Sequence, residues 1–440
     1  MAARSGFLSG LVRLVKRSAG YDAAGSAPAR WRDGDPRWLD WNNTGTVPAS
    51  VIERSRHAYR NDGYYRNGCD ALATALAGSG WGLAPKDAGL LPAWTSYATN
   101  AVWGGGSFDG LTVAVMRDMV VSGEGLVAIQ PDGTLHQLPR DVIDSAFSAD
   151  PGNRRVIREG VEYQDGREVA IHVRLDGATV PERIEKPRYM RVYRQDFPGQ
   201  VRGVPWGASV LVAADTLGET EHALATGVKV AAMFAGIATD ENQAGGDFPF
   251  DGKSSGNVLE SGLEPGTLKV LPSGWRVTFA TPQQAQQSAE FLRHQLHRLA
   301  SGLGVPTHLL SNNLSDANYS SLRAGMVEFN ARTEAQQFGI VVPQFLKPAW
   351  EAFVTRQYLA GEIDNLDAAM ACEFIPPARP WIDPQKDAAA TAEMLKLGLT
   401  SRRRAVAELG WDVARLDQEI SEDRIREAAL GLNFTETNDA

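Results

Sequence analysis

The sequence predicts an α+β fold in which a β-rich segment is followed by two long helices. Residues 125–193 contain short β-type runs that are separated by strong turn signals. An alanine-rich helix pattern covers 208–238, and an amphipathic helix pattern covers 282–303. The chain has 440 residues, 43% of them hydrophobic and 22% charged, which is an ordinary globular composition. Its length suits two or three domains, or one elongated subunit built of several parts.

The first fifty residues are predicted to form an arm outside the main fold. Residues 7–17 are basic and amphipathic, so they could lie on a membrane surface, act as a targeting segment or form a flexible docking arm. Arg13 interrupts what would be the apolar core of a signal peptide, which disfavours secretion. Residues 18–50 are rich in Gly, Ala, Asp and Pro, and their tryptophans would anchor an extended arm to another surface. These tryptophans are Trp31, Trp38 and Trp41.

Two helical regions precede the β-rich segment. The first covers 51–78 and has a break at Asn61-Asp62-Gly63. The second covers 108–121, and an extended piece begins between the two regions at Trp81.

The β-rich segment is predicted from its turns. Asp165-Gly166 is the best hairpin signal in the chain, because a two-residue hairpin turn needs residues that tolerate positive φ. Pro131-Asp-Gly133 is a second strong turn signal. The expected strands are 126–129, 161–163, 169–173 and 188–193.

The segment between the two long helices is expected to be rich in turns. Residues 239–257 are expected to form a loop, with Gly245-Gly246 and Asp251-Gly252 as its breakers. Two short strands, 268–271 and 275–279, are expected to follow.

The second long helix has a complete start signal. Thr281 suits the N-cap, Pro282 the first helical position and Gln284 the capping-box place. An apolar stripe follows at helical spacing, and charged residues gather on the other side. The stripe is Phe291, Leu292, Leu296, Leu299 and Leu303, and the polar side is Glu290, Arg293, His294, His297 and Arg298.

A polar stretch from Gly302 to Ser321 interrupts this helical patterning. Gly302 and Gly304 are typical of a helix end, and Pro306 prevents simple continuation of the helix. A polar tract follows, and a second helix pattern restarts near Tyr319. A conspicuous polar loop between two helices suggests a place where something passes or binds. Its polar residues are Asn312, Asn313, Ser315, Asp316 and Asn318.

The remaining chain is predicted to be mainly helical. A long helical region follows the loop, and Pro343 and Pro348 are expected to kink or break it. Prolines at Pro376-Pro377 and Pro380 indicate a stiff hinge. The expected terminal helices are 383–397 and 402–430.

The motifs that resemble catalytic sites all lack part of their context. Residues 246–254 approach a phosphate-binding loop, but five residues replace the required four and Pro249 removes one backbone donor. Gly252-Lys-Ser-Ser-Gly256 matches a nucleophile elbow without the buried strand and helix that would hold its serine out. His294 and His297 could share a metal with Glu290, but a solvated polar stripe is the simpler interpretation. The sequence therefore favours a structural or conduit role over an enzyme.

Charge and cysteine content narrow the class further. The net charge of −9 disfavours tight binding of DNA phosphates over a broad basic surface. Arg402-Arg-Arg404 is a local exception that could touch nucleic acid or an acidic neighbour, or simply form a surface cluster. Cys69 and Cys372 could form one long-range disulfide, but two reduced buried thiols are the simpler interpretation. Structural zinc is not expected, because no cysteine–histidine cluster exists.

Several separated blocks resemble the lambda-type portal proteins of tailed bacteriophages. They occur in the expected order over roughly residues 40 to 427, and the block from Pro198 to Trp206 is the most specific. The blocks are Arg54-Ser-Arg56 with Arg60-Asn61-Asp62, Pro198-Gly-Gln-Val-Arg-Gly-Val-Pro-Trp206, Lys229-Val-Ala-Ala-Met-Phe-Ala-Gly236, Leu263-Glu-Pro-Gly-Thr267 with Leu271-Pro-Ser-Gly274, Gly302-Leu-Gly-Val-Pro306 with Asn318-Tyr-Ser-Ser321, Trp381-Ile-Asp-Pro384 and Gly398-Leu-Thr-Ser-Arg402.

The resemblance implies an elongated portal-type subunit with wing, stem, clip and crown, which assembles into a ring. The tunnel loop that narrows the channel would be the polar stretch described above. The implied division is an N-terminal arm at 1–50, a wing at 51–205 and 322–380, stem helices at 206–238 and 282–303, a clip at 239–281, a tunnel loop at 304–321, and a crown with C-terminal helices at 381–440. The chain appears shorter than many family members, and its clip candidate is compact.

The resemblance also implies partners and sites. The ring, typically of twelve subunits, would sit at one vertex of a capsid and pass double-stranded DNA during packaging and ejection. It would contact the major capsid protein, the large terminase and a head–tail adaptor protein. It would need no cofactor, metal or small-molecule substrate, and it would not be an enzyme. The particle could be an infectious phage, a prophage product or a gene-transfer agent, assembled in the bacterial cytoplasm.

Particular residues are expected at two of these sites. The DNA-facing tunnel loop would present Asn312, Asn313, Ser315, Asp316, Asn318 and Tyr319. The docking surface of the clip for terminase or adaptor would present Asp247, Phe248, Phe250, Lys253, Glu264 and Trp275. The alternative function is a nucleic-acid-processing enzyme, dependent on metal or ATP, that uses the region of His294 and His297 or Lys253.

Overall fold

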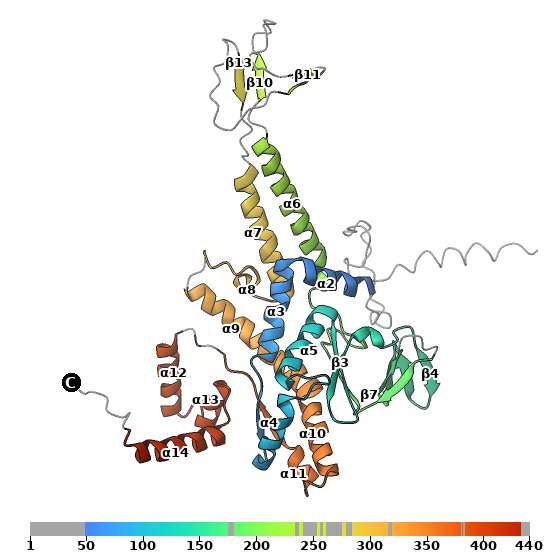
Figure 1. Ribbon diagram of the computed structural model, residues 1–440, viewed down its shortest axis with the longest axis vertical. Helices are drawn as coiled ribbons and strands as arrows, with labels where there is room; N and C mark the ends of the chain where they lie inside the picture. The colour runs from blue at the N-terminus through green and yellow to red at the C-terminus, as the bar shows by residue number, and fades with distance from the viewer. Residues whose placement is uncertain are drawn as a thin grey trace, which may run out of the picture. The chain divides into compact units, whose positions relative to one another are not determined.

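A computed structural model gives the arrangement of the chain as two compact units, each taken here by itself. The first unit is Met1–Val212 with Leu299–Ala440, and the second is Ala213–Arg298. Figure 1 shows the elements of both units coloured along the chain. The structure describes residues 49–174, 180–233, 237–240, 253–255, 258–260, 275–278, 284–315, 319–379, 381 and 383–432. Within these residues, no helix is both long and apolar enough to cross a membrane.

The first unit is built on a group of packed helices. Helices α2 (Ala49–Asn61) and α3 (Gly63–Ala77) are separated by Asp62, whose side chain accepts a hydrogen bond from the backbone N–H of Tyr65. This cap confirms the predicted break, because an aspartate at the N-cap satisfies a free donor of the new helix. Helix α5 (Phe108–Ser122) packs against α3 and confirms the helix that was expected at 108–121.

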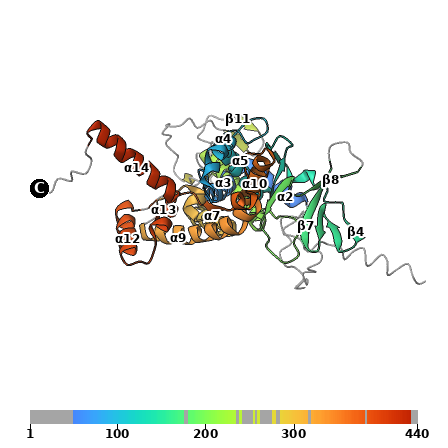
Figure 2. The same ribbon diagram turned by 90° about the horizontal axis from the view of Figure 1, so that it is seen from below.

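Two antiparallel sheets follow α5 and confirm the α+β prediction (Figure 2). The smaller sheet has the order β3-β2-β9, and the larger has the order β4-β5-β6-β7-β8. Asp165 and Gly166 adopt φ values of 51° and 77° between β6 and β7, as the hairpin signal requires. The strands are β2 (Glu124–Ile129), β3 (Leu135–Leu138), β4 (Ala149–Gly152), β5 (Arg155–Arg158), β6 (Val161–Gln164), β7 (Arg167–Val173), β8 (Glu182–Glu185) and β9 (Tyr189–Tyr193).

The sheets share one apolar cluster. Side chains from both sheets and from the segments between them meet there and are almost completely buried, so the sheets and their connections form one core. The cluster comprises Leu126, Ile143, Val161, Ile171, Val173, Tyr189 and Val201.

A second core is aromatic and joins distant parts of the chain. Phe108 of α5 stacks on Phe345 with ring centroids 5.4 Å apart. Trp94 of α4 (Leu91–Thr99) lies 5.2 Å from Phe353 of α10 (Lys347–Leu359). The pair β1 (Gly82–Pro85) and β14 (Cys372–Ile375) was only half predicted, because no local signal indicated β14.

The long helical region of the first unit passes through both of its prolines. Helix α9 (Tyr319–Gln336) continues into a π-helical segment labelled η5 (Gln337–Leu346) that contains Pro343. Pro348 is the second residue of α10, and the helical backbone continues through it. The expectation was a kink or a break; the break is wrong, since the wider π turn accommodates Pro343, and the kink stays a prediction.

The C-terminal helices differ from prediction at one point. Helix α12 (Pro384–Lys396) forms as expected after the N-cap Asp383. The single helix expected at 402–430 is wrong, because α13 (Arg402–Glu408) ends before Gly410 and Asp412 caps a new helix, α14 (Val413–Leu430). The shorter helices of this unit are η2 (Ala88–Leu90), η3 (Arg140–Val142), η4 (Ala208–Val210), α8 (Thr307–Ser311) and α11 (Leu366–Met370).

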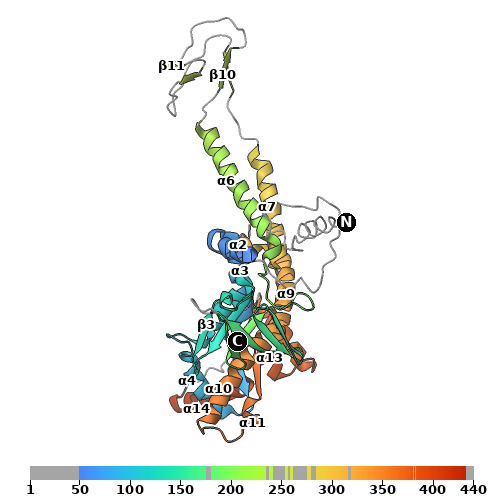
Figure 3. The same cartoon turned by 90° about the vertical axis from the view of Figure 1, so that its right-hand side faces the viewer.

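The described residues of the second unit form most of two helices and four short strands (Figure 3). Helix α6 (Leu211–Met233) and helix α7 (Gln284–Leu303) run alongside each other in opposite directions. Strand β10 (Ile237–Asp240) pairs with β13 (Trp275–Thr278), and β11 (Lys253–Ser255) pairs with β12 (Val258–Glu260).

Two expectations for this unit are wrong. The helix that was expected to reach 238 ends at Met233, and Ile237–Asp240 pairs as a strand instead. Part of the expected loop 239–257 also forms strand β11. Residues 237–240 form a strand because β13, which is distant in sequence, provides partners for their backbone hydrogen bonds. Local helix propensity cannot predict such a pairing. The strand expected at 268–271 and the cap at 281–283 lie outside the described residues.

Candidate functional site

The most specific sequence block, Pro198 to Trp206, forms a buried ionic site in the first unit. Arg202 Nε donates hydrogen bonds to both carboxylate oxygens of Glu124, at 2.9 and 3.1 Å. The backbone N–H of Gly203 donates to Glu124 Oε1 at 2.6 Å. Arg191 Nη1 donates to the carbonyl of Val201 at 2.9 Å. Hydrogen bonds to the Arg202 side chain and to the backbone of Val201 and Gly203 therefore hold the block in place.

Three cations surround the buried carboxylate of Glu124. Burial opposes its ionisation, but the guanidinium groups of Arg202, Arg140 and Arg191 outweigh burial and hold the pKa of Glu124 well below its usual range. Burial also lowers the pKa of Arg140 to about 10, although Glu124 counteracts this effect. Glu124, Arg140 and Arg191 therefore remain charged near neutral pH. A buried charge that loses its partner costs several kcal/mol, so the cluster tolerates little change.

The block also brings two backbone segments into close contact. A Cβ atom on Gly203 would lie 2.0 Å from the carbonyl oxygen of Gly123, so only glycine fits there. Trp206 then donates its backbone N–H to the carbonyl of Val120 at 3.0 Å. These contacts fix the path of the chain into η4 and the start of α6. The block is thus a structural anchor for the first turn of that helix.

The same place anchors the end of α7. A Cβ on Gly302 would lie 2.0 Å from Val210 Cγ1, so the two helices approach closely at this contact. The backbone N–H groups of Gly304 and Val305 donate to the carbonyl of Ala300 at 2.9 and 3.0 Å, which closes the helix end. The prediction that α7 stops at the glycine pair is confirmed.

The polar stretch that follows is not a plain loop, which corrects the expectation for 304–321. It contains the short helix α8, which begins after Pro306. Asn67 Nδ2 on α3 donates to the carbonyls of Leu309 and Leu310, at 2.6 and 2.9 Å. Leu310 is 1% exposed. This helix has no local signal, because its five residues carry no helical period, and packing on α3 stabilises it.

Beyond α8 the polar stretch becomes exposed. Asn312 adopts a left-handed conformation, with φ of 53°, and ends α8 by donating its backbone N–H to the carbonyl of His308. Asn313 Oδ1 accepts a hydrogen bond from the backbone N–H of Ser315 at 2.9 Å. The four residues 312–315, here called the loop tip, are all exposed. The structure therefore exposes the uncharged polar side chains of Asn312, Asn313 and Ser315 in the loop tip, together with the apolar side chain of Leu314.

Other predicted site residues lie partly or wholly outside the described residues. Asp316 and Asn318 are outside, and Tyr319 is described only as the first residue of α9. Lys253 lies in β11 and Trp275 in β13, each described by its backbone. The remaining predicted clip residues are outside: Asp247, Phe248, Phe250 and Glu264.

The described residues offer little support for the enzyme alternative. His294 and His297 are both exposed on α7, and no cluster of three potential metal ligands occurs in the described part of the chain. Cys69 and Cys372 are free thiols, so no disulfide joins them. Burial raises the pKa of Cys372 to about 12, which leaves the thiol protonated and unreactive near neutral pH.

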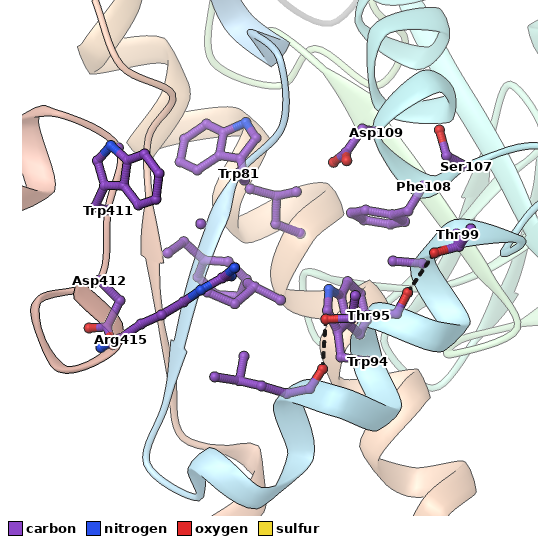
Figure 4. Close-up of a pocket in the computed structure, with 17 residues that line it drawn as sticks. Trp81, Trp94, Thr95, Thr99, Ser107, Phe108, Asp109, Trp411, Asp412 and Arg415 are labelled. Carbon is purple, nitrogen blue, oxygen red and sulfur yellow. Dashed lines mark hydrogen bonds between the residues drawn. The ribbon is translucent and has the colours of Figure 1, made fainter. Parts of the chain in front are cut away.

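Figure 4 shows a cavity of about 420 Å³ in the first unit that sequence analysis missed. Its wall includes Trp81, Trp94 and Trp411, together with Asp109 and Arg415. The Trp81 Nε1 donor is buried without a hydrogen-bond partner, and burial raises the pKa of Asp109. These residues come from distant parts of the chain, so no local motif could reveal them. The lining shows no nucleophile paired with a base.

Comparison with known proteins identifies the family. The profile of the family described as "Phage portal protein, lambda family" matches residues 46–337, which is more than half of the chain. The chain belongs to this family of phage portal proteins, and the resemblance drawn from the sequence blocks is confirmed.

A curated relative and several solved structures are similar to this chain. The "Probable portal protein" of Halomonas phage phiHAP-1 is 26% identical over 325 residues, which cover 68% of this chain and 61% of the relative. The chain thus spans less than two thirds of that relative's length. A chain from the virion of a native gene transfer agent particle aligns with 14% identity and a TM-score of 0.48, covering 82% of this chain and 94% of that one.

Two further structures align with the chain. A chain from the neck of an empty gene transfer agent particle shows 16% identity and a TM-score of 0.49, with coverages of 82% and 94%. An HK97-family phage portal protein from Corynebacterium diphtheriae shows 13% identity and a TM-score of 0.32, covering 62% of this chain and 85% of that one.

Proposed function

We propose that this protein forms a ring at one vertex of a phage or gene-transfer-agent capsid and provides the channel for double-stranded DNA. Its membership of the portal family carries this proposal. The channel would serve both packaging and ejection of the genome. The ring would have twelve copies, which the sequence resemblance implies for the family.

The loop tip at 312–315 is proposed to face the DNA at the narrow part of the channel. Its root is held by α8 and by the two hydrogen bonds from Asn67, so the tip is presented at a defined place. Its exposed side chains include two amides and a hydroxyl and carry no charge. Such groups bind phosphates weakly, which suits a polymer that must slide, whereas a cluster of cations would hold it. Asp316, Asn318 and Tyr319 would extend this surface.

The subunit parts follow from this assignment. The sheets and the packed helices of the first unit would form the wing, α6 and α7 the stem, and the strands between them the clip. The clip would dock the large terminase during packaging and a head–tail adaptor afterwards, through Asp247, Phe248, Phe250, Lys253, Glu264 and Trp275. The wing would contact the major capsid protein, and the C-terminal helices would form the crown.

Electron microscopy of the purified protein tests this function. We expect closed rings with a central hole, both for the isolated protein and at one vertex of the particles. A protein that stays monomeric under all assembly conditions, together with particles that lack a ring, would contradict the proposal. Nuclease and ATPase assays of the wild type and of His297→Ala and Lys253→Ala test the enzyme alternative. Activity lost in either variant would support an enzyme instead.

A further inference from the structure

Helix α6 carries one exposed stripe of ionisable side chains. Asp215, Glu219 and His222 are spaced by four and three residues, which places them on the same face of the helix. All three are exposed, whereas Leu217, about half a turn away from Asp215, is 1% exposed. The stripe therefore points away from the buried side of α6.

Helix α7 carries a matching stripe. Arg298, His294 and Glu290 are spaced by four residues and lie on one face. All three are exposed, whereas Leu299, next to Arg298, is 1% exposed and marks the opposite side of the helix. Each helix therefore presents an ionisable face that does not pack on its own unit.

The contact between Gly302 and Val210 sets the two stripes at matching heights. Counted from that contact, Asp215 lies about 7 Å along α6 and Arg298 about 6 Å along α7, from the helical rise of about 1.5 Å per residue. Glu219 and His294 lie about 13 and 12 Å along their helices by the same count. At the first height a carboxylate on α6 matches a guanidinium on α7, and at the second a carboxylate matches an imidazole, whose ring N–H can donate a hydrogen bond to it.

A third pair continues the pattern with the order reversed. His222 and Glu290 both lie about 18 Å from the anchoring contact along their helices. Here the acid is on α7 and the base is on α6. The two stripes thus place an acid at the height of a basic group three times in succession, and this acid–base order fits in only one register.

No complement of either stripe is found among the residues that the structure describes. Among the described residues, none of these six side chains forms a salt bridge. Six exposed groups that match in height and pair an acid with a basic group fit a contact between copies of the chain. A closed ring repeats one heterologous contact, in which one face of each subunit meets a different face of the next.

We propose that the α6 stripe of each subunit docks on the α7 stripe of its neighbour and sets the axial register of the ring. This inference rests on the proposed function, because it needs a ring. The partner is therefore a second copy of this chain. Electrostatic complementarity of this kind mainly fixes orientation and register and excludes wrong pairings.

Charge reversal in two separate chains tests the contact. The first variant is Asp215→Lys with Glu219→Lys, and the second is His294→Glu with Arg298→Glu. Each variant alone places like charges opposite each other at every interface, so we expect at least about tenfold fewer rings by mass photometry at low salt. Mixing the two variants restores opposite charges at every interface, so alternating rings should reappear.

The matched control for the first variant is Glu53→Lys with Glu408→Lys, which changes the net charge by the same amount as that variant at exposed positions of the first unit. It should form rings as the wild type does. Circular dichroism establishes that each variant is folded. A wild-type protein without rings would overturn the proposed function and this inference with it. Three outcomes would overturn the inference alone. Both stripe variants could form rings as well as the wild type does, or the two variants could fail to form rings when they are mixed. The stripe variants could also form normal rings and lose only the binding of another partner.

Discussion

The ionic site at Glu124 and the loop tip at 312–315 solve different physical problems within one unit. The first buries four charged side chains and binds them through several short hydrogen bonds. The second exposes uncharged polar groups that bond mainly to their own backbone. The comparison shows that the most recognisable sequence block is a framework, whereas the surface proposed to meet DNA has ordinary chemistry. In this protein the most distinctive sequence block is therefore not the surface that is proposed to contact DNA.

The largest effect is expected from breaking the ionic site. Arg202→Ala leaves Glu124 buried with fewer partners, so the free energy of unfolding should fall by about 3–5 kcal/mol. Urea denaturation followed by fluorescence measures this loss. Arg426→Ala is the matched control, because its ion pair with Asp423 is exposed and should change stability by less than about 1 kcal/mol. Equal, small losses in both variants would show that the buried site is not the framework described here.

A second buried carboxylate predicts a pH dependence. Hydrogen bonds from Arg183 outweigh the burial of Glu162 and lower its pKa to about 2, from an ordinary value of 4.5. The ionised group therefore stabilises the fold fully above about pH 4.5, and this contribution is lost as the pH falls towards 2.

Glu162→Gln isolates that contribution. The variant should be less stable than the wild type at pH 7, and the gap should narrow as the pH falls from about 4.5 towards 2. Thermal unfolding across this range provides the measurement. A gap that stays constant with pH would rule out an ionised Glu162 as the source of stability.

A smaller effect is expected at the root of the polar stretch. Asn67→Ala removes both hydrogen bonds to α8, which should lower the free energy of unfolding by about 1–2 kcal/mol. If α8 positions the loop tip, DNA retention in particles should also fall while rings still form. Asn61→Ala, an exposed position on α2, is the control. If α8 is displaced in the variant but the particles retain DNA normally, the loop tip does not contribute to DNA retention.

The smallest effect on stability, and the most specific effect on function, is expected at the tip itself. Replacing Asn312, Asn313 and Asp316 by alanine should leave ring formation intact and lower the free energy of unfolding by only about 1 kcal/mol, because alanine is less favourable than asparagine in the left-handed conformation of Asn312. Packaged DNA length or retention should nevertheless change. Gel analysis of DNA from particles tests this expectation, and unchanged length and retention would contradict the assignment of the tip.

Local signals in the sequence predicted the parts of the fold that local chemistry decides. Asp62 caps α3, Asp165-Gly166 makes its hairpin turn, and Gly304 ends α7, each as its residue type indicates. The missed parts depend on partners far along the chain. Strand β14 pairs with β1, which precedes it by about two thirds of the length of the chain, and α8 is held by a side chain of α3.

The candidate sites could also be predicted from local signals only in part. The loop was located from its polar residues, but its short helix and exposed tip became visible only with the packing of Leu310. Glu124 gives no sign of its role in the sequence, because its three arginines come from separate segments. The matching stripes on α6 and α7 also needed the close contact of Gly302 with Val210, which sets their heights.

The central claim is that the loop tip lines the channel of a ring. The most direct test attaches a gold label to Ser315→Cys in a Cys372→Ser background, where the remaining Cys69 is fully buried. Electron microscopy of the labelled oligomer then locates the label. The account predicts label density around the central axis at the narrowest part of the ring. Label density on the outer rim of the ring would contradict it.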